Sequence, residues 1–266
     1  MKVSSFENET AITANDSGWA CRVEPHWSIG GTPNGGYALS PLLRALGSLA
    51  GLNDPLSVTA HFLRPATPAC AGQITGRSIR SGRTLATAAA SLHQEGTERI
   101  FAVAAFGDLG GASAATALDL DIVAPDIASP ERCVGSGALE EGVEISISSR
   151  LEVRLDPGCA TPGASDRASL DGWVRFADGA PPAVLALPLF ADAFPPSLYP
   201  RFGRFGWVPT VELTVHVRRR PAPGWIQGRF ECDDLVGGRM IETGTLWDED
   251  GRVVARSRQL GLVRSV

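Results

Sequence analysis

Eight stretches of the chain alternate between apolar and polar residues, a pattern typical of strands with one buried face. Each stretch is rich in Val, Ile, Thr, Ala or aromatic residues and ends at a break that contains Gly, Asp or Pro. The stretches span residues 57–64, 72–80, 83–94 and 98–107, followed by 209–218, 224–233, 239–248 and 252–264. Short strands joined by tight turns predict an antiparallel sheet.

One helix is predicted ahead of each set of strands. The first covers Tyr37–Leu46, where apolar residues at 39, 42, 43 and 46 form the stripe of a half-buried helix. The second covers residues 182–194, which are apolar nearly all round, as expected for a helix enclosed by a sheet. The pattern therefore predicts a helix followed by a curved antiparallel sheet, twice.

Asp192 is the only charged residue between Gly179 and Pro200. An isolated ionised carboxylate among apolar side chains is costly unless partners or trapped water compensate it. Two interpretations are open at this point: Asp192 caps a helix or meets a buried donor, or it takes part in catalysis.

The two sets of strands share an order of landmarks. His61 in the first set corresponds to His216 in the second, an offset of 155 residues. The Gly82-Arg83 and Glu95-Gly96 turns recur as Gly238-Arg239 and Asp250-Gly251, at offsets of 156 and 155 residues. A near-constant offset indicates an internal duplication. We expect an α+β tandem hot-dog, with domains at 1–112 and 143–266 and a linker at 113–142, since residues 110–130 are mostly Ala, Ser, Asp and Pro.

Four short motifs in this order carry a family resemblance. They are the Gly-Gly-Thr-Pro-Asn-Gly-Gly-Tyr run at 30–37, Phe-Leu-Arg-Pro at 62–65, Ser-Gly-Arg at 81–83 and the closing strand at 254–262. Together they resemble the TesB-like acyl-CoA thioesterases over nearly the whole chain. The resemblance implies a double hot-dog in which each half is a central helix wrapped by a curved antiparallel sheet.

The resemblance also implies a catalytic trio that holds and polarises one water molecule. Matched position by position, the trio falls on Asp192, Thr210 and Gln259. Leu260 follows the glutamine where a small or acidic residue is usual. The residue types suit the chemistry, because a carboxylate in apolar surroundings is a stronger base and a hydroxyl and an amide can orient a water. Thr210 as a plain strand residue and Gln259 as a solvated side chain are the alternatives.

Two further groups are candidates for substrate contacts. Asn34, Gly35 and Gly36 precede the first helix, where free N–H groups favour a developing oxyanion, although the glycines equally suit a tight turn. Arg64, and Arg219 within Arg218-Arg219-Arg220, are expected to contact coenzyme A phosphates, with solvated strand ends as the alternative. The glycine-rich run lacks the Gly-Lys-Ser/Thr of a nucleotide phosphate loop.

The composition of the chain excludes some classes of binding partner. The 266 residues are 44% hydrophobic and 20% charged, and a net charge of −5 gives no field that would collect nucleic acid. Five scattered cysteines lack metal spacing and are expected to be reduced thiols. The equivalent His61 and His216 are expected to be core or rim residues of the sheet and not metal ligands. We expect no cofactor. Without an apolar leader at the start or a membrane span, we expect a cytoplasmic protein that forms a homodimer or larger homo-oligomer.

The sequence therefore predicts an enzyme of fatty acid metabolism that hydrolyses a fatty or related acyl-CoA to free acid and coenzyme A. One alternative is an acyl-CoA-binding or regulatory protein with the same fold and no turnover. A second is a hydratase or dehydratase that acts on an acyl thioester, which normally needs an Asp/His pair.

Overall fold

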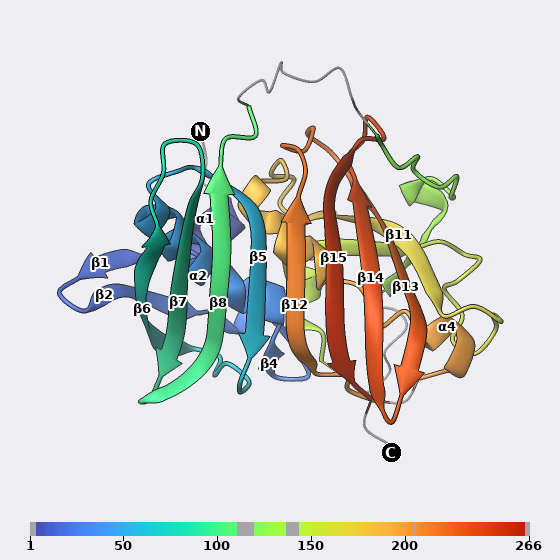
Figure 1. Ribbon diagram of the computed structural model, residues 1–266. Helices are drawn as coiled ribbons and strands as arrows, with labels where there is room; N and C mark the ends of the chain where they lie inside the picture. Colours follow the sequence, from blue (N-terminus) through green and yellow to red (C-terminus); the bar gives the residue numbers. More distant parts are fainter. Residues whose placement is uncertain (1–3, 111–119, 137–143, 205, 264–266) are drawn as a thin grey trace.

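The alternating stretches form strands of one long antiparallel sheet. The computed structural model describes residues 4–110, 120–136, 144–204 and 206–263. Within them, thirteen strands are ordered β1-β2-β6-β7-β8-β5-β12-β15-β14-β13-β11-β10-β9, with the short pair β3-β4 apart (Figure 1).

The elements up to the first connection are α1 (Ser5–Glu9), β1 (Thr13–Asn15), β2 (Gly18–Val23), η1 (Pro25–Trp27), β3 (Ser28–Ile29), β4 (Thr32–Pro33), α2 (Gly35–Ala50), β5 (Asp54–Phe62), β6 (Cys70–Arg80), β7 (Ala86–Gln94) and β8 (Thr97–Gly107). Those that follow are η2 (Pro130–Arg132), β9 (Val134–Gly135), η4 (Ser146–Ser149), β10 (Leu151–Leu155), β11 (Ser169–Phe176), η5 (Val184–Ala186), α3 (Leu187–Ala191), α4 (Tyr199–Phe202), β12 (Thr210–Val217), β13 (Ile226–Val236), β14 (Arg239–Trp247) and β15 (Val253–Leu262).

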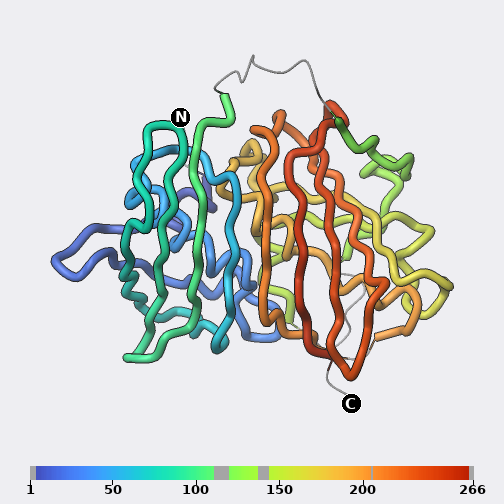
Figure 2. The backbone as a smooth tube through the Cα atoms, in the orientation of Figure 1, coloured from blue at the N-terminus to red at the C-terminus, as the bar shows by residue number. Residues whose placement is uncertain are grey.

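The eight predicted strands are all present, as β5–β8 and β12–β15. The first four lie side by side in one part of the sheet and the last four in the other, and β5 pairs with β12 where the two groups meet (Figure 2). Strands β1 and β2 extend one end of the sheet and β9–β11 extend the other. The predominance of antiparallel strands with few helices agrees with the α+β class.

Helix α2 forms where the apolar stripe predicted a helix, and it is longer than expected. The Asn34 side chain accepts the Tyr37 N–H at 2.9 Å and so caps its beginning, and Gly51 ends it in the left-handed region at φ 67°. Its leucine stripe is fully buried against β6, β7 and β8, and its other neighbours are α3, β5, η5 and β2.

The second helix is much shorter than the predicted 182–194. It consists of the 3-10 turn η5 and the five residues of α3. Pro195 disfavours the helical conformation of Phe194, so the helix cannot extend to residue 194; it ends at Ala191, and Asp192 is its C-terminal capping residue. The early end places the Asp192 carboxylate at the tip of a helix instead of along its side.

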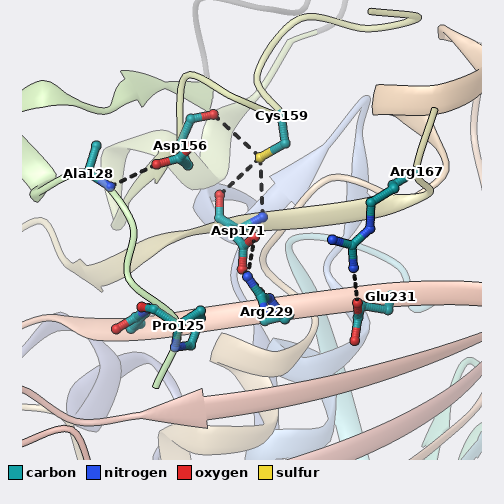
Figure 3. A network of polar contacts seen from close by, with 9 residues as sticks. Pro125, Ala128, Asp156, Cys159, Arg167, Asp171, Arg229 and Glu231 are labelled. Atoms are coloured by element: carbon teal, nitrogen blue, oxygen red, sulfur yellow. Dashed lines mark hydrogen bonds and ion pairs between the residues drawn. The ribbon is translucent and has the colours of Figure 1, made fainter. Parts of the chain in front are cut away.

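The connection between the two groups of strands is held by polar contacts where it is described. The predicted linker 113–142 lies partly outside the described residues, at 113–119 and 137–142, and residues 120–129 have no regular secondary structure. Asp156 accepts the Ala128 N–H at 2.8 Å, and Arg229 clasps Asp171 on the adjacent strand through two hydrogen bonds of 2.7 and 2.9 Å (Figure 3). The Trp173 indole donates to the Ala128 carbonyl at 2.9 Å and the Gln227 amide to the Pro125 carbonyl at 2.7 Å, so the described connection is held against β11 and β13.

The N-terminal helix α1 links the two parts of the fold. Glu9 accepts two hydrogen bonds from Arg150, at 2.8 and 2.6 Å, and a third from the Trp27 indole at 2.7 Å. Burial alone would raise the pKa of Glu9, but Arg150 and Trp27 outweigh it and hold the pKa below its ordinary value.

Replacing Arg150 with Ala is expected to destabilise the fold by about 1–3 kcal/mol, because a partly buried carboxylate loses its cation. Thermal and urea unfolding measure this, with Arg22→Ala as control because the Arg22–Glu24 pair is more exposed. Since the pKa of Glu9 is lowered, its contribution is present above the unfolded pKa of about 4.3 and fades as the pH falls through the folded value. If the difference in free energy of unfolding between wild type and Arg150→Ala did not shrink toward pH 3, this account would be contradicted.

None of the helices in the described part of the chain has the length and apolar character that crossing a membrane requires.

Candidate active site

Asp192 is held by the beginning of α2. Its Oδ2 accepts the Gly36 N–H at 2.9 Å, and its backbone carbonyl accepts the Asn34 Nδ2 at 2.7 Å. Asn34 therefore does two things, since its Oδ1 also caps α2. The N–H groups at the start of a helix carry a partial positive charge, which suits a carboxylate at this place.

Thr210 and Gln259 meet Asp192 from the sheet. Thr210 opens β12, and its hydroxyl donates a long hydrogen bond of 3.4 Å to Asp192 Oδ1. Gln259 lies on the inward face of β15, directly after the exposed Arg258. Its Nε2 contacts the Thr210 hydroxyl and lies 3.5 Å from the same Asp192 oxygen. Three side chains predicted from distant sequence positions thus converge on one point.

The carboxyl group of Asp192 holds its proton more tightly than an ordinary aspartic acid. Burial raises the pKa of Asp192 to about 6, and hydrogen bonds from the Gly36 N–H and the Thr210 hydroxyl counter part of this effect. At neutral pH the group is mostly ionised and more basic than a solvated carboxylate. Such a group can accept a proton from a bound water.

The glycines of the 34–36 stretch permit a close approach between α2 and α3. A Cβ on Gly36 would lie 2.5 Å from the Pro188 carbonyl oxygen, and one on Gly35 would lie 3.1 Å from Asp192 Oδ2. The N–H of Gly36 is already engaged with Asp192. The contacts that are seen therefore give Gly36 the task of holding the Asp192 carboxylate and Asn34 that of holding its backbone carbonyl.

A cavity of about 1120 Å³ opens beside these groups, and Asn34, Gly35, Asp192, Thr210 and Gln259 all line it. Most of its other walls are apolar. Among the described residues, none that lines it is histidine or cysteine, and no cluster of acidic, histidine or cysteine side chains could hold a metal ion. His61 and His216 lie exposed on β5 and β12, away from the cavity walls.

The two predicted arginines lie in different surroundings. Arg64 lines the cavity and is exposed, close in sequence to Leu63, which is 48% exposed. Arg219 is not part of the cavity wall; it pairs with Asp121 at 2.9 Å and donates to the Val253 carbonyl at 3.2 Å. Arg204 and the exposed Trp207 also line the cavity, and Arg204 was not predicted from the sequence.

One buried acid of the cavity wall was also missed. Glu242 lies on the inward face of β14, directly opposite Gln259 in the pairing of β14 with β15. The available signal was its position, because Met240 and Leu246 occupy the same inward face and a charged residue among them breaks the apolar alternation.

Known proteins resemble this chain over nearly its full length. Residues 23–107 match the family model described as the acyl-CoA thioesterase N-terminal domain, and residues 130–263 match the acyl-CoA thioesterase C-terminal domain. An uncharacterized protein of Mycobacterium tuberculosis strain H37Rv is 30% identical over 275 residues, which cover 92% of each chain.

Solved structures share the fold. A crystal structure titled as a thioesterase II candidate from Thermobifida fusca superposes with a TM-score of 0.87 at 28% identity and covers 99% of both chains. A hot-dog protein of unknown function from Alicyclobacillus acidocaldarius gives 0.88 at 22% identity over 100% of both. The acyl-CoA thioesterase II TesB2 of Mycobacterium marinum gives 0.76 at 17% identity, over 98% of this chain and 99% of that one. The predicted hot-dog fold is thereby confirmed.

Proposed function

This chain belongs to the acyl-CoA thioesterase family, and on that premise we propose that it hydrolyses a fatty or related acyl-CoA through a water held by Asp192, Thr210 and Gln259. The observation that carries the proposal is the meeting of a basic, partly buried carboxylate with a hydroxyl and an amide on the wall of a large, mainly apolar cavity. Apolar cavities of this kind accept acyl chains.

The reaction balances with water alone. Thr210 and Gln259 orient the water, and Asp192 takes one of its protons while the oxygen attacks the thioester carbonyl. The tetrahedral intermediate then collapses, the carbon–sulfur bond breaks, and the thiolate of coenzyme A leaves with the proton. The products are a carboxylic acid and a thiol. A thiolate leaves readily, so no covalent enzyme intermediate is needed.

The negative charge that develops on the carbonyl oxygen needs a donor. We assign that role to the Asn34-Gly35-Gly36 stretch, as the sequence predicts. The Gly35 and Gly36 N–H groups both bear on the Asp192 carboxylate, and the lack of side chains at these two positions gives the substrate access to the start of α2. For the coenzyme A phosphates we assign Arg64, which lines the cavity, in preference to Arg219.

We further propose that the chain is a tandem hot-dog with domains at 1–112 and 143–266. The pairing of β5 with β12 supports a duplication: Thr59 lies opposite Thr214, their hydroxyls are 2.9 Å apart, and the two positions differ by the same 155 residues as the sequence landmarks. A pseudo-twofold axis would pass through this pair. We also propose a homodimer or larger assembly, which analytical ultracentrifugation measures directly.

The proposed function is tested by incubating the protein with a panel of acyl-CoAs of increasing chain length and following thiol release. Turnover that Asp192→Asn removes is the expected result. Tight binding without thiol release would identify a non-catalytic acyl-CoA-binding protein instead. Hydration or dehydration products would identify the second alternative, although among the described residues the cavity wall has no histidine to partner the acid.

Hydrolysis is expected to depend on pH through Asp192. The base must be ionised, so kcat/KM should fall about tenfold per pH unit below the pKa near 6 and level off above it. Initial rates at low substrate concentration from pH 4.5 to 8.5 measure this, with enzyme-free blanks for spontaneous hydrolysis. A profile that stays flat down to pH 5 would contradict a base of this pKa.

A further inference from the structure

Glu242 is a buried acid of the cavity that the proposed mechanism does not use. Its side chain lies on β14 two residues beyond Met240, and the two residues are 6% and 1% exposed. Both line the same cavity as Asp192. Burying a carboxyl group beside a methionine is unfavourable unless the group meets a partner.

The partners within the protein satisfy Glu242 only in part. Its Oε2 accepts the Ser197 N–H at 2.8 Å, in the segment that follows Asp192. Across the described residues, no lysine, arginine or histidine forms an ion pair with it. The Ser197 hydroxyl also bears on this carboxyl group and lowers its pKa. In the described part of the chain no hydrogen bond to Oε1 is seen, and Oε1 is not among the fully enclosed unpaired atoms, so it retains access to the cavity. The Ser197 N–H thus fixes one carboxyl oxygen of a group that lines the cavity.

The order of the strands places Glu242 on the inner side of the reacting centre. From the meeting of β5 and β12, the strands β12, β15 and β14 follow in turn, and they carry Thr210, Gln259 and Glu242. The cavity walls near β5 and the start of β12 include the exposed Leu63 and Trp207, whereas Glu242 is enclosed. A thioester whose bulky coenzyme A remains at the exposed side, with its carbonyl at Thr210 and Gln259, directs its acyl part toward Glu242.

We propose that Glu242 binds a hydroxyl group on the acyl part of the substrate, so that the preferred substrates are hydroxyacyl thioesters. The inference rests on the proposed function for the identity of the ligand. An unmatched buried acceptor strongly disfavours an analogue that lacks the matching group, because the polar atom is then left desolvated and unpaired.

A hydroxyl matches Glu242 better than other polar groups do. Burial, and then the nearby charge of Asp192, hold the pKa of Glu242 above its ordinary value. A hydroxyl donates to the ionised form and accepts from the neutral form. A keto oxygen could pair only with the neutral form, and a second carboxylate would repel the ionised one.

The test uses thioether analogues of coenzyme A, which cannot be hydrolysed, so that binding is measured independently of turnover. Each S-alkyl analogue is paired with S-hydroxyalkyl analogues of equal length that carry the hydroxyl at successive carbons. Isothermal titration calorimetry on the wild-type protein should show at least one hydroxyl position that binds about tenfold or more tightly than the plain alkyl chain, the value of one matched buried hydrogen bond.

Glu242→Met is the diagnostic variant, since methionine has a similar length and fills irregular space. It should bind the plain alkyl analogue as well as or better than wild type and lose most of the preference for the hydroxyl. Glu242→Gln keeps an acceptor for the Ser197 N–H and should retain part of the preference. Met240→Leu is the matched control, because it changes the neighbouring wall without polar chemistry and should alter both analogues of a pair equally.

Two results would overturn the proposal. One is a wild-type protein that binds no hydroxyl analogue more tightly than its alkyl partner, which decides the matter even if a variant folds poorly. The other is a Glu242→Met variant that weakens both members of a pair equally, which would make Glu242 a support for the Ser197 segment. Hydroxyl selectivity in binding with no thiol release from any acyl-CoA would leave this inference standing and remove the proposed hydrolysis.

Discussion

Asp192→Asn should lower thioester hydrolysis by about 100-fold or more, the usual size of a general-base contribution. The asparagine keeps the shape of the side chain and can still accept the Gly36 N–H, but it has almost no affinity for a proton. Binding of acyl-CoA should change little, because the carboxylate acts on the water. The measurement is kcat and KM for the best substrate of the panel.

The same variant should be as stable as wild type at neutral pH, or more stable. The folded pKa of Asp192, about 6, lies above the unfolded value of about 3.9, so its contribution favours the fold below the unfolded pKa and is lost as the pH rises through 6. At pH 7 the ionised carboxylate is therefore a cost that asparagine removes. Thermal unfolding on the same preparation should show an equal or higher Tm.

Asp178→Asn provides the matched control. Asp178 accepts the Ser5 and Ala180 N–H groups outside the cavity, and these hydrogen bonds outweigh burial and hold its pKa below the ordinary value. Neutralising it should lower stability and leave hydrolysis unchanged. If instead Asp192→Asn were active and destabilised, Asp192 would be a structural residue and the mechanism would be wrong.

The parts of the fold that the sequence predicts are those encoded locally. The eight central strands and α2 follow from alternation and from the leucine stripe, because burial on one face dictates both patterns. The length of α3 was wrong, since an apolar run says nothing about where a helix ends and the prolines after Asp192 were not weighed. Strands β10 and β11 were missed; they pair with each other, and β11 joins the rest of the sheet only through β13, which lies further along the chain.

In the candidate site, too, individual residues could be predicted from the sequence but their contacts could not. Asp192, Thr210 and Gln259 could be named from a family resemblance, and Asp192 also from its isolation in an apolar run. Their meeting point could not be derived, because it depends on the bulge at the start of β12 and on the pairing of β12 with β15. For Glu242 the break in the apolar alternation was a signal, but only the pairing of β14 with β15 sets it beside Gln259. The arginine pairing of Glu9 likewise joins residues 141 positions apart.

Gln259→Ala should lower kcat by about tenfold to a thousandfold and leave KM nearly unchanged, because a group that orients the water acts mainly in the transition state. Thr210→Ala should do the same. Since the two side chains contact each other and the same Asp192 oxygen, the double variant should lose less than the product of the single losses.

Ser257→Ala is the control for Gln259→Ala, as Ser257 is the previous inward residue of β15 and lies outside the cavity wall. It should keep wild-type kcat, and all variants should keep a cooperative thermal transition. If Gln259→Ala raised KM alone, the amide would bind the substrate, and the water would be held by Asp192 and Thr210 only. If the single losses multiplied in the double variant, Thr210 and Gln259 would act on separate steps, which is incompatible with one water shared among three side chains.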